Sequence, residues 1–460
     1  MLNIKQYKSF AIIFLPAILF IHCTKDWFDV KSDKNQTVPA SLNDFELLLD
    51  NYDVISTQTP GLGDIAADGQ FITEAMWTQY SSNIPLFNNQ RNAYTWSNRV
   101  AYTSLSDWNE SYKKIFHANL VLEGLNKLDN QTETTKYNAI KGNALFIRAK
   151  AYFDLTQIFS ETYSAGKDSE FGLPLVTTPD VTLIPTRSTV HETYQFIIND
   201  LIESSTLCPL TTRKTRASKL ASWALISRLM LIKEDYLKAK KYADSVITVQ
   251  PDLLNFNDLT NNNKPFPGLN SEVIYQSQMT NYALSFRAFI EQTFYNTYEE
   301  NDLRKTLYFN STASGITFKG SYSLIGLPFT GIATDELYLL RAECYARTNS
   351  IELAMNDLNT LLKTRYKKNE DGTSTYKNQT ATTAEQALRL ILTERNKELV
   401  KRGIRWSDLR RLNKDDRFKV TISRTINNET FKIEPNSFKY TFPIPEDEIK
   451  FGKVKQNPGW

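Results

Sequence analysis

Residues 227–247, SRLMLIKEDYLKAKKYADSVI, decide the fold, because they return in altered form at residues 342–362 as AECYARTNSIELAMNDLNTLL. Each stretch contains the end of one helix, a short polar turn and a second helix. Small residues stand at matching places, with Ala239 opposite Ala354, where two helices cross closely. This pattern is typical of a tetratricopeptide-like unit of about 34 residues. We therefore predict a mainly α fold with a scaffold of tetratricopeptide-like helix pairs.

Helical periodicity continues on both sides of this repeat. Further helices are predicted at residues 106–128, 134–163, 188–208 and 384–411. At least three stacked units are needed to bury a continuous core, and these segments supply enough helices for that. We place the scaffold at about residues 106–248 and 335–411.

Three long stretches lack a sustained period and mix Gly, Pro, Asn and aromatic residues, namely about 55–105, 249–334 and 412–460. Pieces such as FKVTIS and KYTFPIP favour short strands. We predict that these stretches form an irregular, loop-rich half that faces a ligand. A first helix follows Ser41, a candidate N-cap with Asp44 three residues on. Residues 41–460 are expected to form a single domain.

The N-terminus has the pattern of an export signal. Lys5 and Lys8 precede a run without charge from Ser9 to Ile21, which is too short to span a bilayer. The run ends at Cys23, and this arrangement resembles a bacterial lipoprotein box. We predict a signal peptide over residues 1–22, lipidation of Cys23 and an extended tether over 23–40. The alternative is a buried N-terminal helix with an ordinary cysteine.

Charge and cysteine content narrow the function classes. Cleavage after residue 22 removes two lysines, so the formal charge falls from +3 to +1. Nucleic-acid binding is not supported, because it needs a basic stripe. The other two cysteines, Cys208 and Cys344, are expected in the core, although a bond between them stays open.

Catalytic and metal-binding motifs are not found. The sequence has three histidines, and none belongs to H-E-x-x-H; a P-loop and a G-x-S-x-G motif are also missing. The segment that begins at Asp64 faintly resembles a calcium loop but lacks ligands at Ala66 and Ala75. We expect a protein that is not an enzyme and has no cofactor and no metal. An acid pair for glycoside hydrolysis stays open from sequence alone.

An aromatic-rich stretch, residues 71–102, is the main candidate for ligand contact. Flat rings cover the C–H faces of sugars, while amides and guanidinium groups bond the hydroxyls. The alternative is that the same rings form a small core beneath a loop. The candidate ligand-binding residues are Trp77, Tyr80, Arg91, Tyr94 and Trp96, with Tyr295 in a second wall.

Residues 394–412, ERNKELVKRGIRWSDLRRL, are dense in charge. Glu394, Glu398 and Arg402 have the spacing of ion pairs along a helix, and Trp406 and Leu409 lie on an apolar stripe. We interpret this segment as a structural helix stabilised by ion pairs in preference to a recognition helix.

Several segments, taken in order, resemble the SusD/RagB family of surface lipoproteins from the Bacteroidota. They span nearly the whole mature chain, although none is decisive alone. They include WNESYKKIFHANLVLEGL, ALFIRAKAYFDLTQIFSETY followed by GLPLV, IPTRSTVHETYQFIINDL, TDELYLLRAECYARTN and the final YTFPIPEDEIKFGKVKQNPGW.

The resemblance implies a location and a partner. It implies a lipid anchor at the outer face of the outer membrane and a SusC-like TonB-dependent barrel that this protein caps like a lid. The implied function is non-catalytic capture of glycans and their delivery to that barrel. Only Cys23 can be carried over residue by residue. The alternatives are a peptide or another non-sugar nutrient as the ligand, or a tetratricopeptide scaffold for protein interactions.

Overall fold

The computed structural model describes residues 39–80, 84–99, 101–102, 106–128 and 134–460. Residues Ala40–Trp460 form one compact unit, and the account below concerns that unit. The predicted signal peptide, Cys23 and nearly all of the tether lie outside the described residues. Among the described residues, no helix combines the length and the apolarity needed to cross a bilayer.

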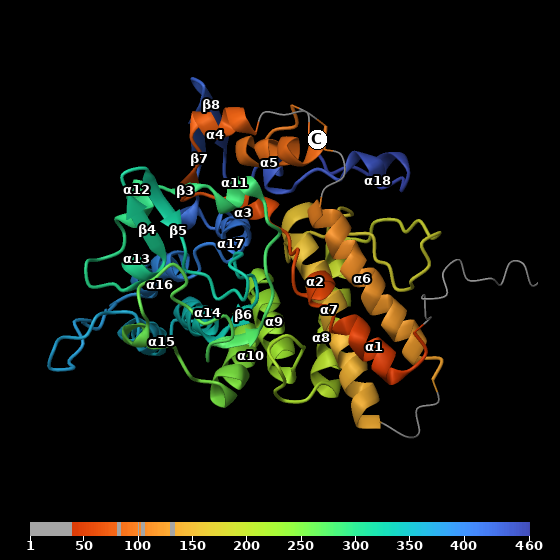
Figure 1. The fold of residues 1–460 in the computed structure, drawn as a ribbon, viewed down its shortest axis with the longest axis horizontal. Coiled ribbons are helices and arrows are strands. Elements are labelled where there is room, and N and C mark those ends of the chain that lie inside the picture. The colour runs from red at the N-terminus through yellow and green to blue at the C-terminus, as the bar shows by residue number, and fades with distance from the viewer. Residues whose placement is uncertain (1–38, 81–83, 100, 103–105, 129–133) are drawn as a thin grey trace, which may run out of the picture. The chain divides into compact units, whose positions relative to one another are not determined.

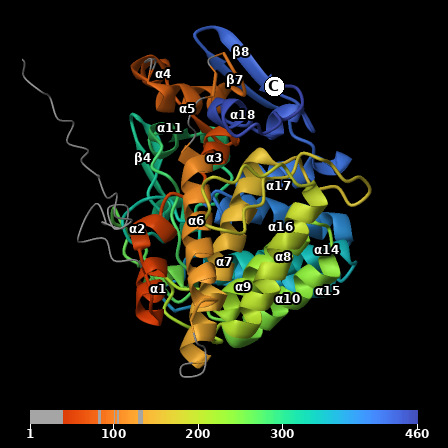
Figure 2. The same ribbon diagram turned by 90° about the vertical axis from the view of Figure 1, so that its right-hand side faces the viewer.

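Long helices packed in chain order form the scaffold, which fills the lower part of the view in Figure 1 and is seen from the side in Figure 2. Each helix contacts the next, from α6 through α10 and on to α14, and α14 also packs against α15 and α16. The long helices are α6 (Ser106–Leu125), α7 (Thr134–Phe159), α8 (Val190–Leu207), α9 (Lys219–Ile232), α10 (Tyr236–Val249), α14 (Thr334–Arg347), α15 (Ile351–Lys363) and α16 (Ala384–Glu398).

The two copies of the sequence repeat are the pairs α9–α10 and α14–α15. Ala239 and Ala354 are fully buried, and the Ser227 hydroxyl donates to the Ala239 carbonyl at 2.7 Å across the first pair. Small side chains therefore permit the close crossing that the repeat predicted. The mainly α fold with helix pairs, an irregular half and few short strands is confirmed.

Short helices and hairpins make up the irregular half. The short helices are α1 (Leu42–Leu49), α2 (Tyr52–Ile55), α3 (Leu62–Ala66), α4 (Glu74–Gln79), α5 (Pro85–Thr95), α11 (Ala283–Phe286), α12 (Gln292–Tyr295), α13 (Arg304–Leu307), α17 (Arg405–Leu412) and α18 (Glu446–Lys450), with 3₁₀ turns η2 (Phe256–Asp258), η3 (Asp416–Phe418) and η4 (Phe438–Tyr440).

Four antiparallel two-stranded ribbons complete this half. They pair β1 (Gln70–Phe71) with β3 (Phe289–Ile290), β2 (Val273–Tyr275) with β6 (Ile332–Ala333), β4 (Phe309–Thr312) with β5 (Gly315–Phe318), and β7 (Ile422–Ile426) with β8 (Glu429–Ile433).

Local signals explain several helix boundaries. Ser41 and Asp44 form the predicted capping box at the start of α1, and Thr189 forms one with Glu192 at the start of α8. The segment 55–105 was expected to be loops, but it contains the eleven-residue helix α5. Pro85 occupies the first turn of α5, where the N–H that proline lacks would have no partner within the helix. This proline is the local signal for the start of α5, and the sequence analysis does not use it.

The charged segment 394–412 is not one helix. α16 ends at Glu398 and α17 begins at Arg405. In the turn between them Lys401 and Gly403 have φ of 58° and 71°, left-handed values that end a right-handed helix. Cys208 and Cys344 are both free and buried, which answers the open question of a bond between them.

Candidate ligand-binding site

Four of the predicted ligand-binding rings lie in one hydrophobic core around α3, α4 and α5. The exposed fractions are 8% for Trp77, 6% for Tyr80, 3% for Tyr94 and 2% for Trp96. The Trp96 indole N–H donates to the Ala66 carbonyl at 3.0 Å, so its polar edge is already bonded. The structure therefore agrees with the alternative prediction, in which these rings form a small core beneath a loop. Their contact with a ligand stays a prediction.

The other two predicted residues lie at the edges of different clusters. The Arg91 guanidinium stacks over the Trp77 ring at 4.0 Å and shields it from solvent. Tyr295 is half-buried and packs edge-on against Phe309, with ring centroids 5.6 Å apart, in a cluster separate from Trp77. The structure does not bring Tyr295 together with the other five residues.

Exposed rings are found instead on the short ribbon β1–β3. Phe71 pairs with Phe289 across the ribbon, and the two rings stack with centroids 5.7 Å apart and an interplanar angle of 29°. Phe71 is 39% exposed, and Phe286 at the end of α11 is 58% exposed. Because side chains alternate along a strand, Gln70 points inward and Phe71 outward. β3 and α11 lie beside α4 and α5 in the upper part of Figure 1.

Buried polar contacts fix the ribbon from below. The Lys401 ammonium donates to the Asp64 carboxylate at 2.9 Å, to the Ser285 carbonyl at 3.0 Å and to the inward-facing Gln70. Charge-assisted hydrogen bonds of this kind are strong when they are shielded from water. The Phe71 ring is therefore presented on a rigid support.

A cleft of about 440 Å³ lies near the ribbon and runs along α12, α16, α17 and η3, although none of its described lining residues belongs to β1 or β3. Two half-buried rings, Phe294 and Phe418, line it together with the amide of Asn396. Gly69, next to β1, lies so near the cleft that a side chain added there would meet the Phe294 ring at 3.7 Å. We call Phe71, Phe286, Phe289, Phe294 and Phe418, with the cleft, the ribbon–cleft surface.

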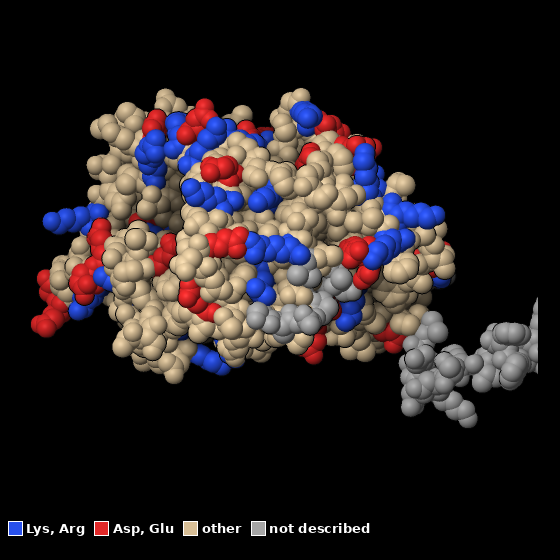
Figure 3. Space-filling view, turned by 90° about the horizontal axis from the view of Figure 1, so that it is seen from above, with Lys and Arg blue, Asp and Glu red and all other residues tan. Residues whose placement is uncertain are grey.

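The upper face of the molecule carries no large field of one sign. Basic and acidic side chains are interspersed over mostly uncharged surface, which is hollowed toward the left of the view in Figure 3. The cleft has five basic lining residues and no described acidic one, but each of the five pairs with a carboxylate outside the lining: Arg389, Lys397, Arg405, Arg417 and Lys419. Rings, amides and guanidinium groups that are charge-balanced in this way suit a ligand that has apolar faces and many hydroxyl groups.

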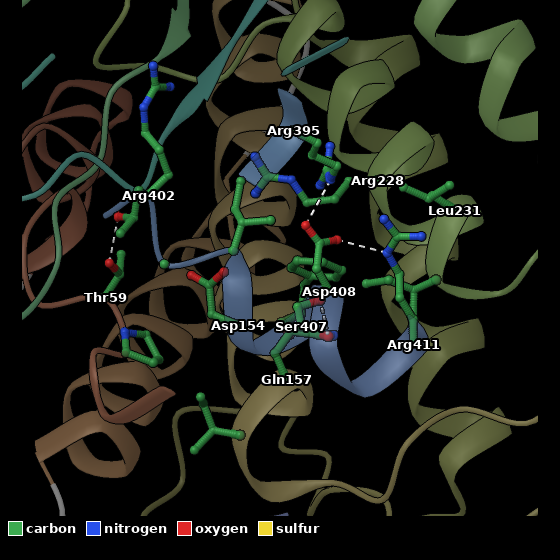
Figure 4. Close-up of a pocket in the computed structure, with 17 residues that line it drawn as sticks. Thr59, Asp154, Gln157, Arg228, Leu231, Arg395, Arg402, Ser407, Asp408 and Arg411 are labelled. Carbon is green, nitrogen blue, oxygen red and sulfur yellow. Dashed lines mark hydrogen bonds and ion pairs between the residues drawn. The ribbon is translucent and has the colours of Figure 1, made fainter. Parts of the chain in front are cut away.

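A buried ionic network lines a separate pocket between α7, α9 and α17 (Figure 4). Asp408 of α17 accepts from the Nε atoms of Arg395 and Arg411, both at 2.8 Å, while Arg228 of α9 donates to Glu336 of α14 at 2.8 Å. Burial raises the pKa of Asp408, but the charges of the two arginines outweigh it and hold that pKa at about 2. The network encloses a polar pocket of about 50 Å³.

This network corrects the predicted pattern of ion pairs. The prediction of a structural ion-pair segment is confirmed, but most partners come from other helices and not from the same helix. Arg402 pairs with Asp335 of α14 at 2.8 Å, and Arg304 of α13 joins Glu394 to Glu398. Sequence spacing within one segment could not reveal these distant partners.

The sequence prediction missed Phe71, Phe286 and Phe289. The aromatic stretch begins at Phe71, but the rings that the sequence analysis predicts to contact a ligand there are Trp and Tyr rings only. The local signal was present in DGQF, because a glycine turn with φ of +79° at Gly69 precedes a short strand that alternates inward and outward. Among the described residues, no group of His, Cys, Asp and Glu is arranged to hold a metal ion.

Comparison with known proteins identifies the class. A family model described as "Starch-binding associating with outer membrane" matches residues 26–231, and one described as "SusD family" matches residues 332–460. The chain belongs to the SusD/RagB family.

Solved structures share this fold at low sequence identity. A putative sugar-binding protein from Bacteroides vulgatus is 24% identical with a TM-score of 0.71, covering 92% of this chain and all of that one. A SusD superfamily protein from Bacteroides thetaiotaomicron is 21% identical with a TM-score of 0.71, covering 91% and 100%. Another from Bacteroides vulgatus is 23% identical with a TM-score of 0.72, covering 92% and 100%. No curated protein matches the chain.

Proposed function

We propose that this chain is a non-catalytic surface lipoprotein that captures oligosaccharides and delivers them to a SusC-like TonB-dependent transporter in the outer membrane. The observation that carries the proposal is the exposed Phe71 ring, stacked on the half-buried Phe289 ring near a cleft lined with rings and an amide. Family membership supports it, and so does the name of one similar structure, a putative sugar-binding protein.

Each part of the ribbon–cleft surface has a role in this proposal. The Phe71 ring covers the C–H face of one sugar unit, and Phe294 and Phe418 contact units further along the cleft. The amide of Asn396 and the hydroxyl of Thr393 bond sugar hydroxyls. Selectivity among sugars comes from the arrangement of several rings and polar groups, since one stacking face contributes only on the order of 1 kcal/mol of binding free energy.

The lining of the cleft also supports binding without catalysis. Glycoside hydrolysis uses two carboxyl groups, one on each side of the scissile bond. Among the described residues that line the cleft, none is Asp or Glu. Incubation with candidate polysaccharides should therefore produce no new reducing ends.

Calorimetry with a panel of oligosaccharides tests the binding site. We expect Phe71→Ala to weaken binding of a recognised oligosaccharide about fivefold or more, because a stacking face is lost. Phe451→Ala is the matched control, since Phe451 is a 75% exposed ring outside the cleft. Equal affinity of wild type and Phe71→Ala would reject the ribbon as the platform. Binding of peptides in place of sugars would favour the non-sugar alternative.

The partner is tested separately. Pull-down from detergent-solubilised membranes should recover a protein of the size of a TonB-dependent barrel, whose partner machinery supplies the energy for import. Recovery of soluble proteins only would favour a scaffold for protein interactions.

A further inference from the structure

A second pocket, of about 260 Å³, lies where the end of α7, the end of α17 and the C-terminal segments meet. None of its lining residues belongs to the ribbon–cleft surface. It is smaller than the roughly 300–1,000 Å³ typical of sites for drug-sized ligands, so it suits one sugar ring and not a chain.

The inner wall carries a buried cation, Arg410, that is 5% exposed. Its guanidinium donates to the Thr156 carbonyl at 2.8 Å, to the Ser160 carbonyl and to the Thr162 hydroxyl at 3.2 Å, but it forms no ion pair with a described carboxylate. The carbonyls at the end of α7 offset part of the charge. Burial lowers the pKa of Arg410 to about 10, against the smaller opposing effects of Tyr194 and Glu161.

Three side chains that line the same pocket hold buried polar atoms with hydrogen-bonding capacity to spare: Asn457 Oδ1 has no partner, while Asn413 Nδ2 and the Tyr440 hydroxyl have only each other. Other contacts fix both amides. Asn413 Oδ1 accepts from the Val420 N–H at 3.0 Å, and Asn457 Nδ2 donates to the Phe159 carbonyl at 2.9 Å.

The three atoms thus offer an amide donor, a phenol and an amide acceptor. A side-chain hydrogen bond from Asn413 lowers the pKa of the Tyr440 phenol, although burial dominates and raises it to about 12. Sugar hydroxyl groups both donate and accept, so they complement this set of donors and acceptors.

The mouth of the pocket offers a ring and a second cation. Phe438 is 45% exposed and is held edge-on by Trp460, with centroids 5.4 Å apart. Lys414 donates to the Tyr163 carbonyl at 3.2 Å and pairs with Glu234 outside the lining. Glu161 is the one acidic side chain among the described lining residues, facing the two cations Arg410 and Lys414.

We propose that this pocket binds a single acidic sugar unit, a hexuronate, with its carboxylate toward Arg410 and Lys414. Its hydroxyls bond Asn413, Tyr440 and Asn457, and its C–H face covers Phe438. The inference does not depend on glycan capture at the ribbon–cleft surface, because it uses no residue of that surface.

Crystal soaking and calorimetry of the mature chain with D-galacturonate and D-glucuronate test the proposal. We expect density for one sugar in the pocket and an affinity about tenfold higher than for the neutral methyl galactoside. Acetate, which has the charge without the hydroxyls, should bind more weakly than the uronate. Ordered water alone in the soaked pocket, equal binding of the neutral glycoside, or binding at crystal concentration only would overturn the proposal.

Matched variants separate this pocket from other sites. Phe438→Ala and Lys414→Gln should each weaken uronate binding about fivefold or more, while Phe451→Ala and Lys450→Gln, on exposed residues outside the pocket, should not. Arg410→Lys keeps a positive charge in the pocket, and the melting temperature of this variant shows whether it is folded.

Phe71→Ala should leave uronate binding unchanged. Wild-type protein that binds uronate but no oligosaccharide would reject the proposed function alone, and wild-type protein that binds oligosaccharide but no uronate would reject this inference alone.

Discussion

Asp408 of α17 forms an ion pair with Arg395 of α16 and so links the two helices. Its two carboxylate oxygens accept separately from Arg395 and Arg411, and its side chain is 8% exposed. We expect Asp408→Asn to destabilise the protein by about 3–5 kcal/mol at pH 7, because it leaves two buried guanidinium groups partly unpaired. Urea unfolding measures this loss. Asp416→Asn, on a side chain that is 87% exposed, should change stability little.

The same carboxylate predicts a dependence of stability on pH. The pKa of Asp408 is about 2 in the folded protein, below the ordinary value of 3.8. A lowered pKa stabilises the folded state above the unfolded pKa, and this stabilisation is lost as the pH falls through the folded pKa. The difference in unfolding free energy between wild type and Asp408→Asn should therefore be constant above about pH 5 and shrink between pH 4 and pH 2. A difference that stays constant over that range would contradict the assignment.

Trp96 illustrates how the role of a residue changes once its surroundings are known. From the sequence, Trp96 was a candidate stacking face, so its replacement would weaken glycan binding. The structure buries it with Arg424 over its ring at 4.6 Å. We now expect Trp96→Ala to cost about 3–5 kcal/mol of stability through the cavity it leaves. A thermal melt measures this, and an unchanged melting temperature with lost glycan binding would restore the original prediction.

At the scale of elements, the crossing of α1 and α6 depends on one glycine. A Cβ at Gly124 of α6 would lie 2.3 Å from the Phe45 ring of α1, and that ring is 2% exposed. We expect Gly124→Ala to destabilise the protein by about 1–3 kcal/mol, since the ring has to move within a packed core. Gly166→Ala is the matched control, because nothing lies within 4 Å of an added Cβ there. Chemical denaturation compares them, and equal stabilities would show that α1 shifts without cost.

Elements with local signals could be predicted, and elements set by distant partners could not. The capping box of Ser41 and the repeat around Ala239 and Ala354 need only neighbouring residues, and both were found. The exposure of Phe71 depends on the pairing of β1 with β3, which lies far away in the chain. The break between α16 and α17 depends on left-handed backbone at Lys401 and Gly403, where a dense charge pattern hid the turn.

For the whole molecule, the stacked helices act as a support that brings distant loops together. The ribbon–cleft surface takes rings from segments near residues 71, 289, 294 and 418, and the ionic network ties α16 and α17 to α9 and α14. Composition indicated that rings would gather in the irregular half. It could not separate rings that face solvent from rings that face the core, because both kinds occur within residues 71–96.

The anchor is the prediction that concerns the whole molecule, since capture at the cell surface requires attachment. Two or more acyl chains on Cys23 would hold the chain stably at a membrane, where one chain gives only marginal binding. We expect Cys23→Ser to abolish labelling by a radioactive fatty acid and to release the protein from the membrane fraction. Cys208→Ser should keep the label, because burial raises the pKa of the Cys208 thiol to about 11 and leaves it protonated and unreactive. Label that persists on Cys23→Ser, or wild-type protein found free of membranes, would contradict the lipoprotein assignment and with it the capture of nutrients at the outer face.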